Sequence, residues 1–177
     1  MNRLIPCLLI LLASVMTHAN TVLQVSDELR YSIDRQVDFL LDGSFELALE
    51  DVRASDQWQP INRDIVNLGF IKEAAWFRFE LQAINSNDYI LHLPYPILDY
   101  IDHYSFVDGK PYLEINTGDA RKFDTRAVNH IDFIFPYRLE ADQILTVYLR
   151  IASEGSLDVP LRFSSKDLFL ESDTKNI

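Results

Sequence analysis

Apolar side chains alternate with polar ones along several segments of this chain, and no other feature limits the fold as strongly. Between residues 144 and 152 the apolar side chains recur at every second position, and residues 77–81 and 89–93 repeat the pattern. A fourth row consists of Ile131, Phe133 and Phe135. A period of two places alternate side chains on opposite faces of a strand, one buried and one in water. The chain is therefore predicted to consist mainly of half-buried strands.

Turn-forming residues separate these segments. Asp108-Gly109-Lys110 lies between two strand-like runs, at 101–107 and 111–115, which is the composition of a tight hairpin. Residues 85–88 and 155–156 mark further connections. Many short strands joined by turns predict an all-β fold, a two-sheet antiparallel sandwich of the jelly-roll type.

Two segments depart from the strand pattern. Residues 44–52 predict one short helix, with Ser44 as its cap and Phe45, Leu49 and Val52 on one face. Residues 166–177 turn polar, and we interpret them as a C-terminal linker or a frayed end.

The first 19 residues have the three parts of a secretory signal peptide. Arg3 supplies a positive start, residues 4–15 are apolar, and small residues at Thr17 and Ala19 favour cleavage after Ala19. The apolar run is too short to span a membrane. We therefore predict an exported protein with a signal peptide at 1–19 and one domain at 20–165. Cleavage would remove Cys7, the only cysteine, and with it any disulfide or thiolate metal site.

The charge balance argues against one class of partner. With 16 basic and 27 acidic residues the net charge is −11, and no basic stripe is present. Such a chain repels phosphate backbones, so we expect no nucleic-acid partner.

Several segments, in order, resemble a known sensor family. The most specific are the strand Ala75-Trp76-Phe77-Arg78 and the stretch Gly118-Asp119 followed by Phe123 and Arg126. The remaining family-like segments are 39–42, 58–60, 67–70, 98–102, 147–153 and 159–163. Together they resemble the second type of extracellular domain of the bacterial seven-transmembrane receptors with diverse intracellular signalling modules.

This resemblance implies a fold, a location and partners. The fold would be a jelly roll similar to carbohydrate-binding modules, and it would face the periplasm. In that family a seven-helix membrane domain follows, with a diguanylate cyclase or a histidine kinase as output module. The sequence ends at Ile177 before any such helix. We therefore expect either the sensor portion of a receptor or a free-standing product.

Trp76 and Arg78 are the first candidate ligand-binding pair, because both fall on the strand face opposite Phe77 and Phe79. An aromatic face stacks on sugar C–H groups, and a guanidinium donates paired hydrogen bonds to hydroxyls or carboxylates. The alternative is structural: Trp76 would cover the core edge and Arg78 would bridge to a carboxylate on a neighbouring strand.

The loop after residue 117 holds the second candidate group. Arg121, Lys122 and Arg126 could form a positive spot for an anionic ligand on an acidic domain, so we also list Arg121 and Arg126 as ligand-binding candidates. The alternative is a structural ion pair between Asp119 and Arg126 that closes the loop. We also expect a structural role for Trp58.

No metal site or cofactor is predicted. Asp99, Asp102, His103 and Asp108 are too few, and alternate sides too regularly, to supply the six to eight oxygen ligands of a calcium ion, so calcium is disfavoured. His92, His103 and His130 lack metal-ligand spacing and are interpreted as strand histidines.

Catalysis is not predicted either. The chain has no Gly-x-Ser-x-Gly elbow and no phosphate-binding glycine loop. Our first functional hypothesis is a non-catalytic periplasmic domain that senses a carbohydrate or another small molecule for a signal-transduction receptor. The second is a free-standing secreted lectin-like or adaptor protein of the cell envelope.

Overall fold

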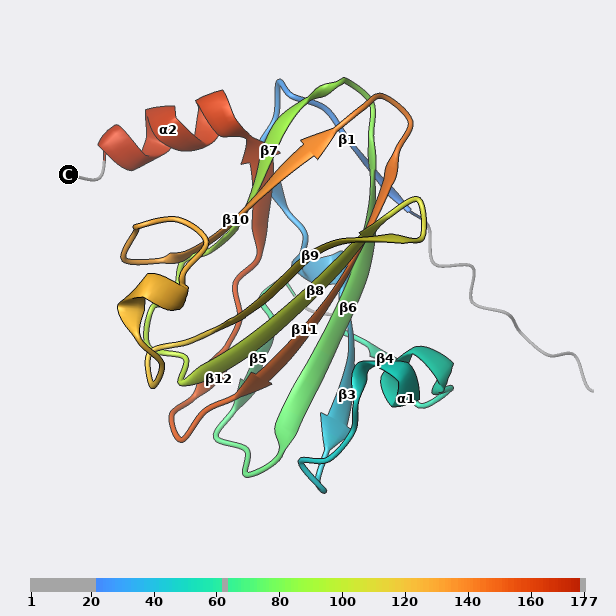
Figure 1. Cartoon of the computed structure of the whole chain (residues 1–177), viewed down its shortest axis with the longest axis vertical. Helices are drawn as coiled ribbons and strands as arrows, with labels where there is room; N and C mark the ends of the chain where they lie inside the picture. The colour runs from blue at the N-terminus through green and yellow to red at the C-terminus, as the bar shows by residue number, and fades with distance from the viewer. Residues whose placement is uncertain (1–21, 62–63, 176–177) are drawn as a thin grey trace, which may run out of the picture.

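The computed structural model describes residues 22–61 and 64–175, and in this part of the chain two antiparallel sheets face each other (Figure 1). The signal peptide predicted at 1–19 lies outside the described residues. The larger sheet has the strand order β4 (Gln59–Pro60), β3 (Asp38–Asp42), β6 (Ala74–Ala83), β11 (Ile144–Ala152), β8 (Tyr100–Val107) and β9 (Lys110–Thr117). A seventh strand, β1 (Leu23–Val25), also pairs with β6, and this pairing is parallel.

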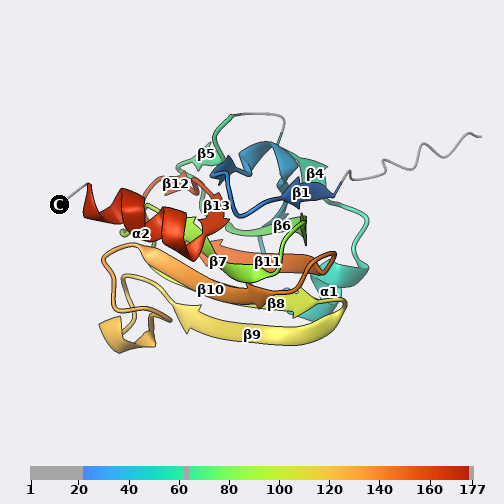
Figure 2. The same cartoon turned by 90° about the horizontal axis from the view of Figure 1, so that it is seen from above.

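The smaller sheet has four strands, in the order β10 (Phe133–Leu139), β7 (Asn87–Leu93), β13 (Arg162–Ser165) and β2 (Tyr31–Ser32). A two-strand ribbon pairs β12 (Leu157–Asp158) with β5 (Asn67–Gly69). The helices are α1 (Leu49–Ala54) and α2 (Lys166–Thr174), with the single 3₁₀ turns η1 (Asp34–Gln36) and η2 (Phe123–Thr125). Figures 1 and 2 show α1 and α2 on opposite sides of the molecule. The prediction of an all-β, two-sheet sandwich is confirmed.

The core consists of the apolar rows that the alternation predicted. The inward side chains of β6, β7 and β11 are buried, and they pack on those of β10 and β13 in one cluster between the sheets. The fourth row is only partly right, because β10 begins at Phe133. Phe133 and Phe135 are buried, but Ile131 lies in the preceding loop and is 68% exposed.

The predicted hairpin and helix both exist, with one shift. Asp108 and Gly109 form the turn between β8 and β9, and both have positive φ. The helix begins at Leu49 instead of Ser44, because the side chain of Asp42 holds residues 44–47 in a turn. Asp42 accepts hydrogen bonds from the Ser44 hydroxyl and the Leu47 amide, which takes those residues out of the helical conformation.

The C-terminal segment 166–177, which the sequence indicates to be a linker or a frayed end, is not frayed over residues 166–174. These form α2, whose first turn is capped by the Ser165 hydroxyl, which accepts from the Leu168 amide. Phe169 is the one buried residue of α2, and it packs on Ile90 and Ile134 of the smaller sheet. A single apolar anchor explains why the segment reads as polar. No helix in the described ranges is long and apolar enough to cross a membrane.

Candidate functional site

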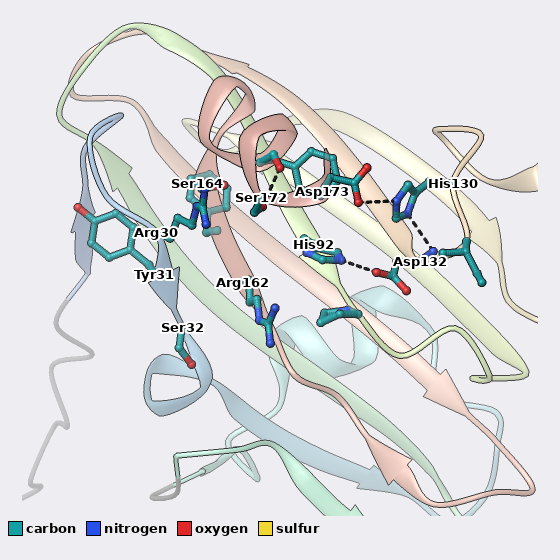
Figure 3. Close-up of a pocket in the computed structure, with 14 residues that line it drawn as sticks. Arg30, Tyr31, Ser32, His92, His130, Asp132, Arg162, Ser164, Ser172 and Asp173 are labelled. Carbon is teal, nitrogen blue, oxygen red and sulfur yellow. Dashed lines mark hydrogen bonds and ion pairs between the residues drawn. The ribbon is translucent and has the colours of Figure 1, made fainter. Parts of the chain in front are cut away.

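A cleft of about 700 Å³ lies between the outer face of the smaller sheet and α2 (Figure 3). Its floor comes from β2, β13 and β7, and α2 forms one wall. The loop that precedes β10, including His130 and Asp132, forms another wall. Ile131 and Pro94 add apolar surface, which gives the exposed Ile131 a place in the cleft.

The floor is one row of side chains across three paired strands. Arg162 of β13 lies directly opposite Ser32 of β2 on one side and His92 of β7 on the other. Paired residues of neighbouring strands share a face, and the adjacent residues Leu91 and Phe163 point into the core. The row of three polar side chains therefore faces outward, and its His92 lies against Phe169 of α2.

Two histidines connect the floor and the walls. His92 Nε2 lies 2.7 Å from a carboxylate oxygen of Asp132, and His130 Nε2 lies 3.1 Å from Asp173 of α2. The Asp132 amide donates to His130 Nδ1 at 2.9 Å. Because Nδ1 accepts that bond, the proton of neutral His130 belongs on Nε2, where it is donated to Asp173. His130 thus links the loop to α2.

Burial sets the protonation of the second histidine. Desolvation is the main cause that lowers the pKa of His92, and the positive charge of Arg162 lowers it further. The hydrogen bond to Asp132 acts in the opposite direction and raises this pKa. The ring of Phe169 packs edge-on against both imidazoles, at centroid distances of 5.2 Å from His92 and 5.9 Å from His130. The lowered pKa keeps the His92 imidazole neutral at neutral pH, beside the carboxylate of Asp132.

The two arginines of the cleft differ in their partners. Arg30 donates to the Leu168 carbonyl at 2.6 Å and lies 3.9 Å from Glu171 of α2. Arg162 is exposed, and no hydrogen bond or ion pair joins its guanidinium to another residue within the described ranges. In Figure 3 the Arg162 side chain projects from β13 near His92 without a marked interaction.

None of the four residues predicted to bind ligand lines this cleft. Trp76 is only 1% exposed, because α1 covers it: its ring packs on Leu40 and Val52 and stacks on Tyr104. A sugar could stack on Trp76 only if α1 moved away. This burial agrees with the structural alternative, in which Trp76 covers the edge of the core.

Arg78 also follows its structural alternative, since it bridges to a neighbouring strand. It donates two hydrogen bonds to Asp38 of β3, at 3.1 and 3.0 Å, and its guanidinium lies 4.5 Å from the ring centroid of Trp58. Trp58 in turn donates from Nε1 to the Val52 carbonyl of α1 at 2.8 Å. Trp58 thus joins α1 to the sheet. A shallow hollow of about 210 Å³ lies beside Arg78 and Tyr148.

Arg121 ties its loop to the larger sheet. Its guanidinium donates to the carbonyls of Ile101 and Thr117 at 3.0 and 2.8 Å and pairs with Asp102 at 2.7 Å. These contacts engage both terminal nitrogens of the guanidinium within the protein. The neighbouring Lys122 is exposed, and its side chain has no described polar contact.

This difference gives a first testable prediction. Replacement of Arg121 by Met should lower the free energy of unfolding by about 2 kcal/mol, because a half-buried charge-assisted bond network is lost. Replacement of Lys122 by Met should change it by less than about 0.5 kcal/mol. Urea unfolding of both variants measures the difference, and equal midpoints would contradict the structural role of Arg121.

The expected ion pair between Asp119 and Arg126 is not among the contacts of the described residues. Arg126 instead donates to the carbonyl of Ile131, and its guanidinium lies 4.2 Å from the ring centroid of Phe133. The Asp119 amide donates to the Leu98 carbonyl at 2.7 Å. Both residues hold the loop through the backbone, and the Asp119 charge acts on Arg126 only at longer range.

The acidic residues near position 100 point to different partners. Asp99 accepts from the Ser153 hydroxyl and the Glu154 amide, whereas Asp102 pairs with Arg121 and Arg150. Asp108 accepts from the Ile144 amide. Within the described ranges no group of three or more His, Cys, Asp or Glu residues is arranged to hold a metal ion.

Sequence reasoning missed the cleft residues His92, His130 and Arg162. From the sequence alone the two histidines are interpreted as isolated strand residues, and Arg162 stands only inside the family-like segment 159–163. One signal was available: His92 follows the outward register of Ile90 in a strand whose other face is apolar. Sequence spacing does not show which strands lie beside the one that holds His92.

Solved structures resemble the fold only distantly. A beta-glucosidase from Kluyveromyces marxianus is 12% identical, with a TM-score of 0.43, over 78% of this chain and 18% of that chain. A family 35 carbohydrate binding module from Clostridium thermocellum is 11% identical, with a TM-score of 0.34, over 77% of this chain and 91% of that chain. Likenesses at this level indicate no shared ligand or activity. No curated protein matches the chain.

A family model gives the decisive comparison. The model described as 7TMR-DISM extracellular 2 matches residues 34–165, which include both sheets of the sandwich except β1 and β2. The matched range also ends at Ser165, the residue that caps α2. The chain belongs to the 7TMR-DISM extracellular 2 family.

Proposed function

We propose that the chain is a periplasmic sensor domain and that the cleft beneath α2 binds a small hydroxyl-rich ligand such as a carbohydrate. The observation that carries this proposal is the row Ser32, Arg162 and His92 on the floor of a cleft that has α2 as one wall. Membership of a family of receptor extracellular domains supports the sensory role.

The chemistry of the cleft fits a ligand with several hydroxyl groups. The carboxylates of Asp132 and Asp173 have acceptor oxygens beyond those that bind the imidazoles, and Arg162 supplies donors. Ile131 and Pro94 provide apolar contact for the C–H groups of a sugar ring. Such a mixture of apolar surface and a few placed polar groups is typical of small-molecule sites.

The same contacts support binding without catalysis. Nucleophilic catalysis needs a hydroxyl within hydrogen-bond reach of a base. In the described cleft the Ser32 hydroxyl donates to Asp34, and the Ser172 hydroxyl donates to the Phe169 carbonyl. Each histidine is paired with a carboxylate, and no described serine hydroxyl bonds to either one.

A sensor must also transmit the binding event, and α2 is placed to do so. It forms a cleft wall through Phe169, Ser172 and Asp173, and it directly follows β13. A ligand shifts a receptor between two states only if it binds them with different affinity. We propose that ligand contact with α2 provides that difference, and that a membrane domain with a cyclase or kinase output module receives it.

A matched pair of variants on α2 tests the location of the site. Replacement of Ser172 by Trp should fill the cleft and abolish binding, because Ser172 lines it. Replacement of Leu170 by Trp adds the same ring to a side chain that is exposed and outside the cleft, so binding should persist. Binding is measured by NMR with neutral, acidic and amino monosaccharides, and the His92 and His130 ring resonances should shift.

Two outcomes would contradict the proposal. One is that no sugar of the panel binds the wild-type protein. The other is that a sugar binds both tryptophan variants equally, with chemical-shift changes near Arg78 and Tyr148 instead of the histidines. That result would move the site to the hollow on the larger sheet.

A further inference from the structure

We infer that the ligand of the cleft is an acidic sugar, a pyranose ring with one carboxylate that pairs with the guanidinium of Arg162. This inference rests on the proposed function and specifies its ligand class.

All but one of the charges of the described cleft are engaged within the protein. Asp132 and Asp173 each accept a hydrogen bond from a histidine, at 2.7 and 3.1 Å. Arg30 is bound to the C-terminal helix through the Leu168 carbonyl. Arg162 is the one charged side chain of the described cleft with no hydrogen bond or ion pair of its own. A single anionic group on the ligand would give it a partner.

The position of Arg162 suits a paired carboxylate contact. Its strand register places it between Ser32 and His92 in the middle of the floor, and its side chain is open to the cleft. A guanidinium presents two parallel N–H donors that match the two oxygens of a carboxylate. The ring hydroxyls would then face the carboxylate oxygens and the walls described above.

Arg162 also faces the His92 imidazole, which gives the inference a second signature. His92 is surrounded by Asp132 and His130 of the loop, Arg162 of β13 and Phe169 of α2. The positive charge of Arg162 is one of the causes that lower the pKa of His92, after burial. A carboxylate bound to Arg162 would offset that charge and raise the pKa of His92. By linkage, binding should take up protons in the pH range between the free and bound pKa values, and affinity should rise as the pH falls through that range.

Calorimetry with galacturonate and galactose tests the inference. Galacturonate should bind the wild-type protein at least tenfold more tightly than galactose, which lacks the carboxylate. The heat measured near pH 6 in two buffers of different ionisation enthalpy should show proton uptake with galacturonate only. Arg162→Gln should lower the galacturonate affinity at least tenfold and the galactose affinity by less than threefold, because galactose would lose only hydrogen bonds to its hydroxyls, and Arg162→Lys should lie between wild type and Arg162→Gln.

Arg138→Gln is the matched control. Arg138 also lies on the smaller sheet, but it pairs with Asp88 outside the cleft, so its replacement should leave both affinities unchanged. Thermal melting should show that Arg162→Gln is folded, as expected for a side chain whose guanidinium has no described polar partner.

The two proposals fail in different ways. Equal affinity for the two sugars, unaffected by Arg162→Gln but abolished by Ser172→Trp, would overturn the acidic-sugar inference and leave the cleft as a sugar site. If neither galacturonate nor galactose binds but another sugar of the panel does, only the acidic-sugar inference is overturned, whereas absence of binding by every sugar of the panel would contradict both proposals. Loss of galacturonate binding in Arg138→Gln as well as in Arg162→Gln would show general electrostatic attraction and would overturn the specific pair.

Discussion

Replacement of Gly118 by Ala is expected to destabilise the domain by about 3–5 kcal/mol, the sum of an overpacking cost and a strained backbone. A Cβ atom at residue 118 would lie 2.1 Å from the carbonyl oxygen of Asp99, which is backbone and has no room to move. Gly118 also has φ +136°, which side-chain-bearing residues rarely adopt. Urea unfolding followed by fluorescence or circular dichroism measures the loss.

Gly155 provides the control for this prediction. Its Cβ would meet only the Ser153 hydroxyl, at 3.7 Å, and its φ is not positive. Gly155→Ala should therefore change the free energy of unfolding by less than about 1 kcal/mol. If both alanine variants unfolded at the same urea concentration, the close approach of residues 99 and 118 would be contradicted.

The Gly118 contact explains why family-like segments far apart in the sequence occur together. The amides of Asp119 and Ala120 donate to the carbonyls of Leu98 and Asp99. The Asp99 carboxylate then binds the Ser153 hydroxyl and the Glu154 amide at the end of β11. Three segments that resemble the family thus meet at Asp99. Their shared pattern reflects the backbone junction of the fold, away from the cleft.

The strands were predictable because each one reports its own burial through alternation. Every second residue of β11 from Leu145 to Ile151 is buried, as its sequence period indicates. The same rule identified the face of Trp76 and Arg78 but could not show what covers it. The short helix α1 lies over Trp76 because its Val52 packs with Trp76 and Leu40, which are distant from it in sequence.

The cleft could not be predicted for a related reason. Its residues come from β2, β7, β13, α2 and a loop, so no local spacing brings them together. The order of the strands decides that Ser32, Arg162 and His92 are neighbours. The helix α2, which forms one wall of the cleft, could not be predicted either, because Phe169 is its one buried residue.

His103 illustrates a property that depends on the folded environment alone. It lies on the inward face of β8, 0% exposed, where it stacks on Phe135 at a centroid distance of 4.3 Å and bonds to the Tyr137 hydroxyl. Burial lowers the pKa of His103 from 6.5 to about 3. The folded protein therefore keeps this imidazole neutral in a pH range where the unfolded chain protonates it.

The consequence is a large loss of stability in acid. Below pH 6.5 the unfolded state binds one more proton at His103 than the folded state, so this residue should lower the free energy of unfolding by about 1.4 kcal/mol per pH unit. The loss should continue until the pH approaches the folded pKa of about 3. Urea unfolding of the wild type and of His103→Gln at pH 7.5, 6.5, 5.5 and 4.5 measures it. The glutamine variant should be less stable at pH 7.5 through altered packing. Between pH 6.5 and 4.5, however, its free energy of unfolding should fall less steeply with decreasing pH, by about 1.4 kcal/mol per pH unit. The difference isolates His103 because His92 and the carboxylates contribute equally to both proteins. Parallel slopes would show that His103 is protonated in the fold, and they would contradict its burial between the two sheets.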